Sequence, residues 1–153
     1  MKRITKVYLI SLLIVLIFTL MDINNIEPFH QLDSSNAWDL YNKFSAPAIF
    51  FSWLGAFAVL GLLWFIAKKD KSEALAVFLT PTIMVYFGLE DTLFHIIKGV
   101  PMAQCMDWLN NNPILFNIAK IFGENCVTIF ILLLSTIIGL GISYFVLKKL
   151  FKM

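Results

Sequence analysis

The sequence predicts an all-α, polytopic membrane protein with four transmembrane helices, and two observations carry this prediction. The chain of 153 residues is 59% hydrophobic and only 14% charged, with a mean hydropathy of +0.82, whereas a soluble domain carries about 25% charged residues. Four apolar runs approach or reach the length that a bilayer core of roughly 30 Å requires. We expect one transmembrane domain over residues 1–153, with short amphipathic interfacial helices in its two outer loops.

The spans are expected at residues 7–21, 46–67, 74–97 and 126–147. The first span is short and follows basic residues, as a signal peptide does. However, the polar run at residues 22–25 lacks the small residues of a cleavage site, so we expect the span to be retained. The short loop at residues 68–73 joins the second and third spans as an antiparallel hairpin.

Basic residues indicate the orientation. Those on one predicted side of the membrane are Lys2, Arg3, Lys6, Lys68, Lys69, Lys71, Lys148, Lys149 and Lys152. The outer loops, 22–45 and 98–125, contain only Lys43, Lys98 and Lys120. The positive-inside rule then predicts a multi-pass protein of the cell membrane with both termini in the cytoplasm. No basic stripe of the kind that binds nucleic acid is present in the sequence.

Both outer loops show helical patterns. In the first loop, Trp38, Tyr41 and Phe44 recur every three residues, which is typical of a surface amphipathic helix or of an aromatic belt that only anchors the loop. The second loop predicts two short helices, with apolar positions from residue 102 to 109 on the first. Asn112 is the expected N-cap of the second helix, and Pro113 is its first residue.

The two cysteines, Cys105 and Cys126, lie in or beside the second outer loop. They form one structural disulfide or stay free. The chain is similar in span count and orientation to four-helix membrane oxidoreductases that form disulfides, but it lacks the C-x-x-C motif that thiol exchange needs in such enzymes. We therefore do not expect redox catalysis.

Small residues recur on two of the expected spans. They are Ser52, Gly55, Ala58 and Gly61 on the second span and Ser135, Gly139 and Ser143 on the fourth. Small residues in register let another helix approach closely. These stripes indicate packing surfaces, and they allow a homo- or hetero-oligomer through the second and fourth helices.

The candidate site is an acid pair, Glu90 and Asp91, inside the third span. An acid at the centre of the bilayer costs roughly 2.5–3.5 kcal/mol on insertion scales, so a span that keeps two usually has a functional reason. At about 100° per residue, both acids share one face with His95 and Lys98. On a straight helix they lie about 11 Å below the outer boundary, which favours a substrate that enters from outside.

Three interpretations of this polar face stay open. In the leading hypothesis, Glu90, Asp91 and His95 form a catalytic or binding site near the outer leaflet. One carboxyl group is protonated there, and the protein binds or acts on a membrane lipid or another lipophilic molecule. In the second, the protein handles a metal or another ion. In the third, an Asp91–His95 hydrogen bond and a Glu90–Lys98 pair only hold helices together in an assembly or scaffold subunit. Whether the protein is an enzyme stays open.

The metal interpretation involves more residues than the acid face alone. Glu90, Asp91 and His95 offer oxygen and imidazole donors, and Glu27 and His30 in the first outer loop add an E-x-x-H spacing that shares one face if helical. His30 and His95 are the only histidines, and the topology lets them approach. Two histidines at most would serve one haem iron, so haem is not expected.

The run Glu90-Asp91-Thr92-Leu93-Phe94 resembles the acid-pair motif of two membrane families. In the membrane lycopene cyclases a helix carries P-x-E-E-x-x-F-F, and the CAAX-protease-like proteins carry E-E-x-x-x-R. The resemblance to the cyclases implies acid-initiated ring closure with Glu90 or Asp91 as the proton donor. Gly88 and Leu89 replace the proline context of the cyclases, and His95 stands where the second family has arginine.

Overall fold

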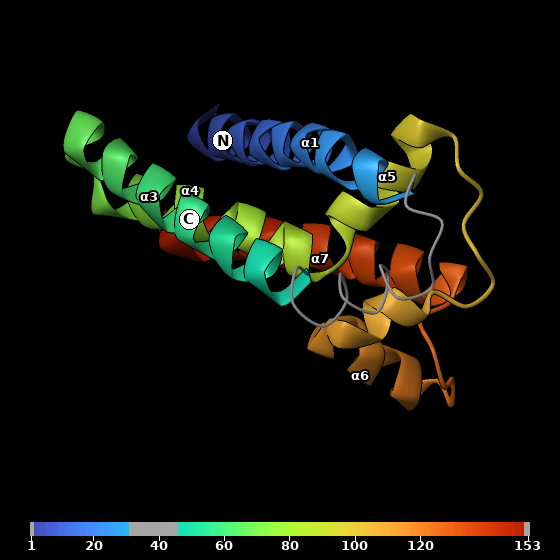
Figure 1. Cartoon of the computed structure of the whole chain (residues 1–153). Coiled ribbons are helices and arrows are strands. Elements are labelled where there is room, and N and C mark those ends of the chain that lie inside the picture. Colours follow the sequence, from blue (N-terminus) through green and yellow to red (C-terminus); the bar gives the residue numbers. More distant parts are fainter. Residues whose placement is uncertain (1, 31–45, 152–153) are drawn as a thin grey trace.

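The computed structural model describes residues 2–30 and 46–151, including the side chains of residues 3–24 and 51–151. The described helices are α1 (Lys2–His30), α3 (Ala46–Lys68), α4 (Lys71–Tyr86), α5 (Leu89–Lys98), the 3₁₀ helix η2 (Asp107–Asn111), α6 (Pro113–Ile121) and α7 (Ile129–Leu150). Figure 1 shows α1, α3, α4 and α7 as a bundle, with α6 beside one end.

Three helices are long and apolar enough to cross a membrane, over Arg3–Asn24, Phe51–Lys68 and Ile129–Leu150. Helices α4 and α5 meet the same criterion only when taken together, and they are bent by 65° where they join. The described chain is therefore an all-helical membrane protein with three candidate spans, or four if the bent pair counts as one.

The structure corrects several predicted boundaries. The fourth span lies at Ile129–Leu150, where we expected 126–147. Helix α1 continues to His30, so residues 22–30 are helical although we placed them in the first outer loop. Hydropathy marks where the apolar side chains end, while a helix continues as long as its backbone hydrogen bonds do. The predicted third span, 74–97, is not one continuous helix, because it is broken between Tyr86 and Leu89. The expected amphipathic helix around Trp38 lies outside the described residues.

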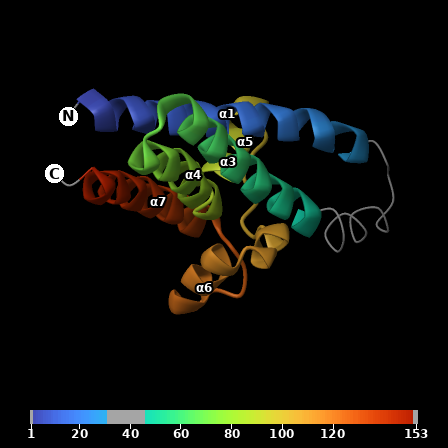
Figure 2. The ribbon, with the colours of Figure 1, turned by 90° about the vertical axis from the view of Figure 1, so that its left-hand side faces the viewer.

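Helix α4 lies at the centre of the bundle, in contact with α1, α3 and α7 (Figure 2). Its buried side chains join two apolar clusters. One cluster consists of Ile4, Val7, Ala76, Val77 and Leu147, and the other of Val15, Phe57, Met84, Val85 and Leu89. The small stripe predicted on the last span faces inward, where Ser135, Gly139 and Ser143 are buried and Gly139 packs against Phe87. That stripe therefore packs against other helices of the same chain.

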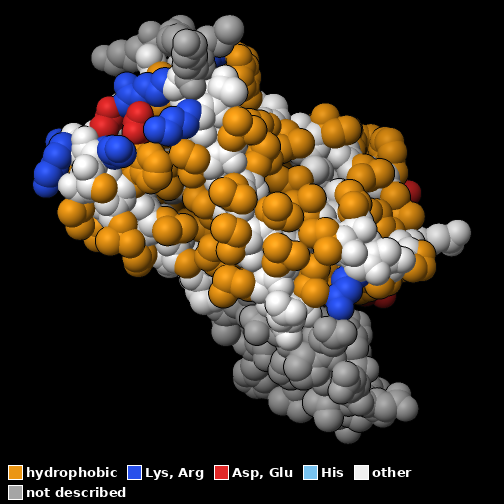
Figure 3. Space-filling view, turned by 90° about the horizontal axis from the view of Figure 1, so that it is seen from above, with side chains coloured by type: hydrophobic (Ala, Val, Ile, Leu, Met, Phe, Trp, Pro, Cys, Tyr) orange, Lys and Arg blue, Asp and Glu red, His pale blue; other side chains and the backbone are white. Residues whose placement is uncertain are grey.

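Arg3 joins three parts of the chain at one end of the bundle. It forms an ion pair with Asp70 in the α3–α4 turn, and its Nε lies 2.7 Å from Oε1 of Glu73. Its guanidinium group also lies 4.6 Å from the ring centre of Phe151. The start of α1, the α3–α4 turn and the end of α7 thus share this end. Figure 3 shows basic and acidic side chains gathered at one end of an otherwise largely apolar face.

The second loop is built as predicted around Asn112. Its side chain accepts hydrogen bonds from the backbone N–H groups of Ile114 and Leu115, and Pro113 begins α6. The first predicted helix of the loop is instead the short 3₁₀ helix η2. Cys105 and Cys126 form a disulfide, with 5.6 Å between their Cα atoms, which decides between the two states left open by the sequence.

Candidate functional site

The site is organised around the break between α4 and α5. Gly88 stands at this break with a φ of +85°, a backbone conformation that side chains with a Cβ disfavour. A Cβ at this position would also lie 2.5 Å from Cδ1 of Leu132 on α7. Glycine therefore meets two requirements here, one of backbone conformation and one of space.

Side chains replace the hydrogen bonds that the broken helix loses. The carbonyl oxygen of Tyr86 accepts from Nδ2 of Asn112 at 3.0 Å, and that of Phe87 accepts from Oγ1 of Thr136 at 3.4 Å. The carbonyl oxygen of Gly88 keeps its backbone hydrogen bond from Thr92 at 3.0 Å and also accepts from the hydroxyl group of Thr92 at 2.9 Å. A backbone carbonyl without a partner costs several kcal/mol in hydrocarbon. The break is therefore stabilised by side-chain hydrogen bonds from the N-cap of α6 and from α7.

Three acids converge just beyond this break. Glu90 and Asp91 lie in the first turn of α5, where the positive end of the helix dipole favours negative charge. Asp22 approaches from α1, which packs against α5. Its carboxyl group is within hydrogen-bonding range of that of Glu90 and interacts electrostatically with Asp91. We call Asp22, Glu90 and Asp91 the acid cluster.

The acid cluster is largely shielded from solvent. The exposed fractions of Asp22 and Glu90 are 8% and 6%, and Asp91 is half-buried. The electrostatic neighbours of Glu90 are the two other acids, and its buried Oε1 has no hydrogen-bond partner. A hydrogen bond between two carboxyl groups needs a proton on one of them. Three carboxyl groups this close cannot all be ionised without protons or added positive charge.

His95 is buried on α5 but is engaged elsewhere. Its Nδ1 lies 3.2 Å from the carbonyl oxygen of Val100, and its ring centre lies 6.4 Å from that of Trp108 on η2. Its hydrogen bond thus goes to the loop after α5, not to Asp91 as the helix-holding interpretation expected. His95 thus links α5, which carries Glu90 and Asp91, to the residues that follow this helix.

Glu27 and His30 lie in the last part of α1, so the predicted E-x-x-H spacing falls on a helix. Their side chains lie outside the described ones, and the structure does not test their part in a metal site. Glu90 and Asp91 come together, as adjacent positions require. The residue that joins them is Asp22, which we had assigned to the first outer loop.

A signal for Asp22 exists in the sequence. The buried positions of α1 include Ser11, Val15, Thr19 and Asp22 at spacings of three and four residues, which place them on one helical face. Ser11 and Thr19 are polar residues on this face, and the next position of the face, about one turn after Thr19, is Asp22. The apolar run ends at Met21, so hydropathy alone does not reveal that the helix continues beyond it.

No known family model, curated protein or solved structure matches the chain.

Proposed function

We propose that this protein takes up a small cation in exchange for protons at the acid cluster, within a membrane domain of four spans in which α4 and α5 together form one broken span. The observation that carries this proposal is the buried Glu90 carboxyl group, which faces two other acids and has an oxygen without a hydrogen-bond partner. Carboxylate oxygens are ligands for hard cations such as Na⁺, Ca²⁺ and Mg²⁺.

The broken span supports the same proposal. Discontinuous helices in transporters place coupling-ion sites near the middle of the membrane, where unwound backbone and helix ends meet. Here the break at Phe87 and Gly88 brings the first turn of α5 against α1. If α4 and α5 formed one straight helix, the first turn of α5 would point in another direction. Glu90 and Asp91 would then not lie in the same position relative to α1.

The cation is favoured over the lipophilic molecule that the sequence first indicated. A small pocket of about 10 Å³ lies between α3 and α4, lined by Trp53, Leu54, Phe57, Thr82, Val85 and Tyr86. Sites for drug-sized ligands occupy roughly 300–1,000 Å³, and this lining contains no member of the acid cluster. The lipid-binding function remains a prediction, and this pocket of the described residues does not support it.

We also propose that both termini face the cytoplasm, as the lysine distribution predicts. The Cys105–Cys126 disulfide supports this orientation, because disulfides persist in compartments outside the cytosol. It lies in the second outer loop, which the positive-inside rule assigns to the outer side. The acid cluster would then be loaded from outside the cell.

The experiment measures cation binding and proton release on the detergent-purified protein. NaCl, CaCl₂ and MgCl₂ are added to weakly buffered protein with a pH dye, and choline chloride controls for ionic strength. We expect one of these cations to release protons and to raise the melting temperature, since a ligand that binds only the folded state stabilises it. Glu90→Gln and Asp22→Asn should abolish both responses.

Glu124→Gln is the matched control, because Glu124 is an exposed acid outside the cluster. This variant should respond as the wild type does. A wild-type protein that releases no protons with any of the three cations would contradict the proposal. An undiminished response in both cluster variants would contradict it as well.

A further inference from the structure

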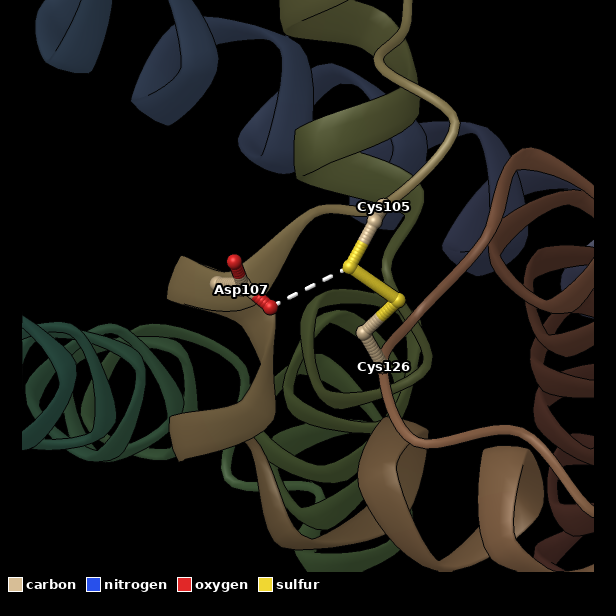
Figure 4. A group of neighbouring side chains, drawn as sticks. All are labelled: Cys105, Asp107 and Cys126. Atoms are coloured by element: carbon tan, nitrogen blue, oxygen red, sulfur yellow. Dashed lines mark hydrogen bonds between the residues drawn. A yellow bond between two sulfur atoms is a disulfide. The ribbon is translucent and has the colours of Figure 1, made fainter.

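A second group of candidate ligands lies on the loop between α5 and α7, apart from the acid cluster. Cys105, Asp107 and Cys126 offer one ligand atom each, and these atoms lie within 4.8 Å of one another. Figure 4 shows the carboxylate of Asp107 beside the disulfide, with its Oδ1 3.2 Å from Sγ of Cys105. Cys105 and Asp107 are exposed, and Cys126 is half-buried.

The backbone holds the two cysteines together without the help of the disulfide. The N–H of Met106 donates to the carbonyl oxygen of Val127 at 2.9 Å, and the N–H of Val127 donates to Oδ1 of Asn110 at 3.2 Å. Met106 and Val127 are fully buried in one apolar cluster with Leu115 and Ile131. We therefore expect the residues that follow each cysteine to remain paired when the sulfur–sulfur bond is opened.

Reduction of the disulfide would leave two thiols beside one carboxylate, and such a donor set matches the chemistry of a borderline-soft divalent ion. Zn²⁺ binds cysteine sulfur and carboxylate oxygen in tetrahedral geometry, and three protein ligands with one water molecule are a common set. Hard ions such as Ca²⁺ and Mg²⁺ prefer oxygen donors alone. The loop group and the acid cluster thus select different ions.

We propose that reduction of the disulfide converts this loop into a Zn²⁺ site formed by Cys105, Cys126 and Asp107, with water in the fourth position. The reductant is an external dithiol, which supplies two electrons and two protons to the S–S bond and itself becomes a disulfide. The two thiols then lose their protons as the metal binds. The oxidised form cannot hold the ion, because its sulfur atoms are bonded to each other.

The test uses Co²⁺ as a spectroscopic substitute for Zn²⁺. The full-length protein in detergent is reduced with a phosphine under argon and titrated with CoCl₂. We expect one Co²⁺ per chain with a thiolate-to-cobalt charge-transfer band and tetrahedral visible bands, both bleached by added ZnCl₂. The oxidised protein should show neither band. Cobalt held by the acid cluster gives no thiolate band, so failure of this proposal and failure of the cation proposal are distinguishable.

Two variants identify the ligands. Asp107→Asn should weaken cobalt binding by about tenfold or more, since even indirect partners of a metal ligand contribute that much. Glu124→Gln removes an exposed acid from the same loop and should leave the affinity unchanged. Absence of the thiolate band in the reduced wild type would overturn the proposal, whether the loop fails to bind or loses its shape. Equal cobalt affinities in Asp107→Asn and wild type would overturn it too.

Discussion

Asn112 holds the end of α4 and the start of α6 with the same side chain. Its Nδ2 donates to the carbonyl oxygen of Tyr86 at 3.0 Å, while its Oδ1 accepts from the N–H groups of Ile114 and Leu115 at 3.0 and 3.3 Å. Both helix ends would otherwise leave backbone groups without partners. The second loop is thereby fixed to the helix break that positions Glu90 and Asp91.

Replacing Asn112 with alanine should destabilise the protein by about 2 kcal/mol, because it removes an N-cap together with the hydrogen bond from Nδ2 to the carbonyl oxygen of Tyr86. The measurement is the free energy of unfolding in detergent micelles. Asn117→Ala, at an exposed position of the same helix α6, is the control and should change stability by less than about 0.5 kcal/mol. Equal effects of the two substitutions would count against the double role of Asn112.

Gly88→Ala should be clearly more destabilising than Gly99→Ala. Both glycines have a positive φ, which costs a residue with a Cβ about 1–2 kcal/mol. Only at Gly88 does the added Cβ meet a neighbour, Leu132, whereas nothing lies within 4 Å at Gly99. Overpacking adds about 1–3 kcal/mol. Melting temperatures of the two variants test this order, and a reversed order would show that the break tolerates a side chain.

Asp22→Asn should raise the melting temperature in buffer without Na⁺ or divalent cations. The substitution removes one of three neighbouring acids while its amide can still pair with the carboxyl group of Glu90. Sites arranged for function commonly lower stability, so their removal stabilises the fold. The control is Glu124→Gln, which should not change the melting temperature. A large loss of stability in Asp22→Asn would instead indicate that the acid cluster serves only packing.

Asp70→Asn should reduce stability at neutral pH but not in acid. The backbone N–H of Glu73 and the side chain of Arg3 hold the pKa of Asp70 below its ordinary value of 3.8. A carboxyl group with a lowered folded-state pKa stabilises the protein above the unfolded-state pKa, and this stability is lost as the pH falls through the folded-state value. Asparagine keeps the N-cap and removes the charge. Melting temperatures across the pH range should therefore converge in acid, and a constant difference would exclude the charge as the cause.

The sequence located several features because their signals are local. Asn112 followed by Pro113 predicted the start of α6, since capping and a fixed proline φ depend on adjacent residues. Glu90 and Asp91 stood out because acids are rare in apolar runs. The break at Gly88 was missed, because hydropathy measures only how apolar a segment is. Pro81 lies inside α4, so this proline does not mark the break.

The sequence by itself determined that this is a helical membrane protein with an acid pair in its third apolar segment, since composition and periodicity are properties of the chain alone. Tertiary structure decided the rest. Asp22 joins Glu90 only because α1 continues past its apolar stretch and packs on α5. Cys105 meets Cys126, 21 residues further along the chain, beside the pairing of Met106 with Val127. Contacts between distant residues depend on how helices pack, and no local pattern in the sequence encodes that arrangement.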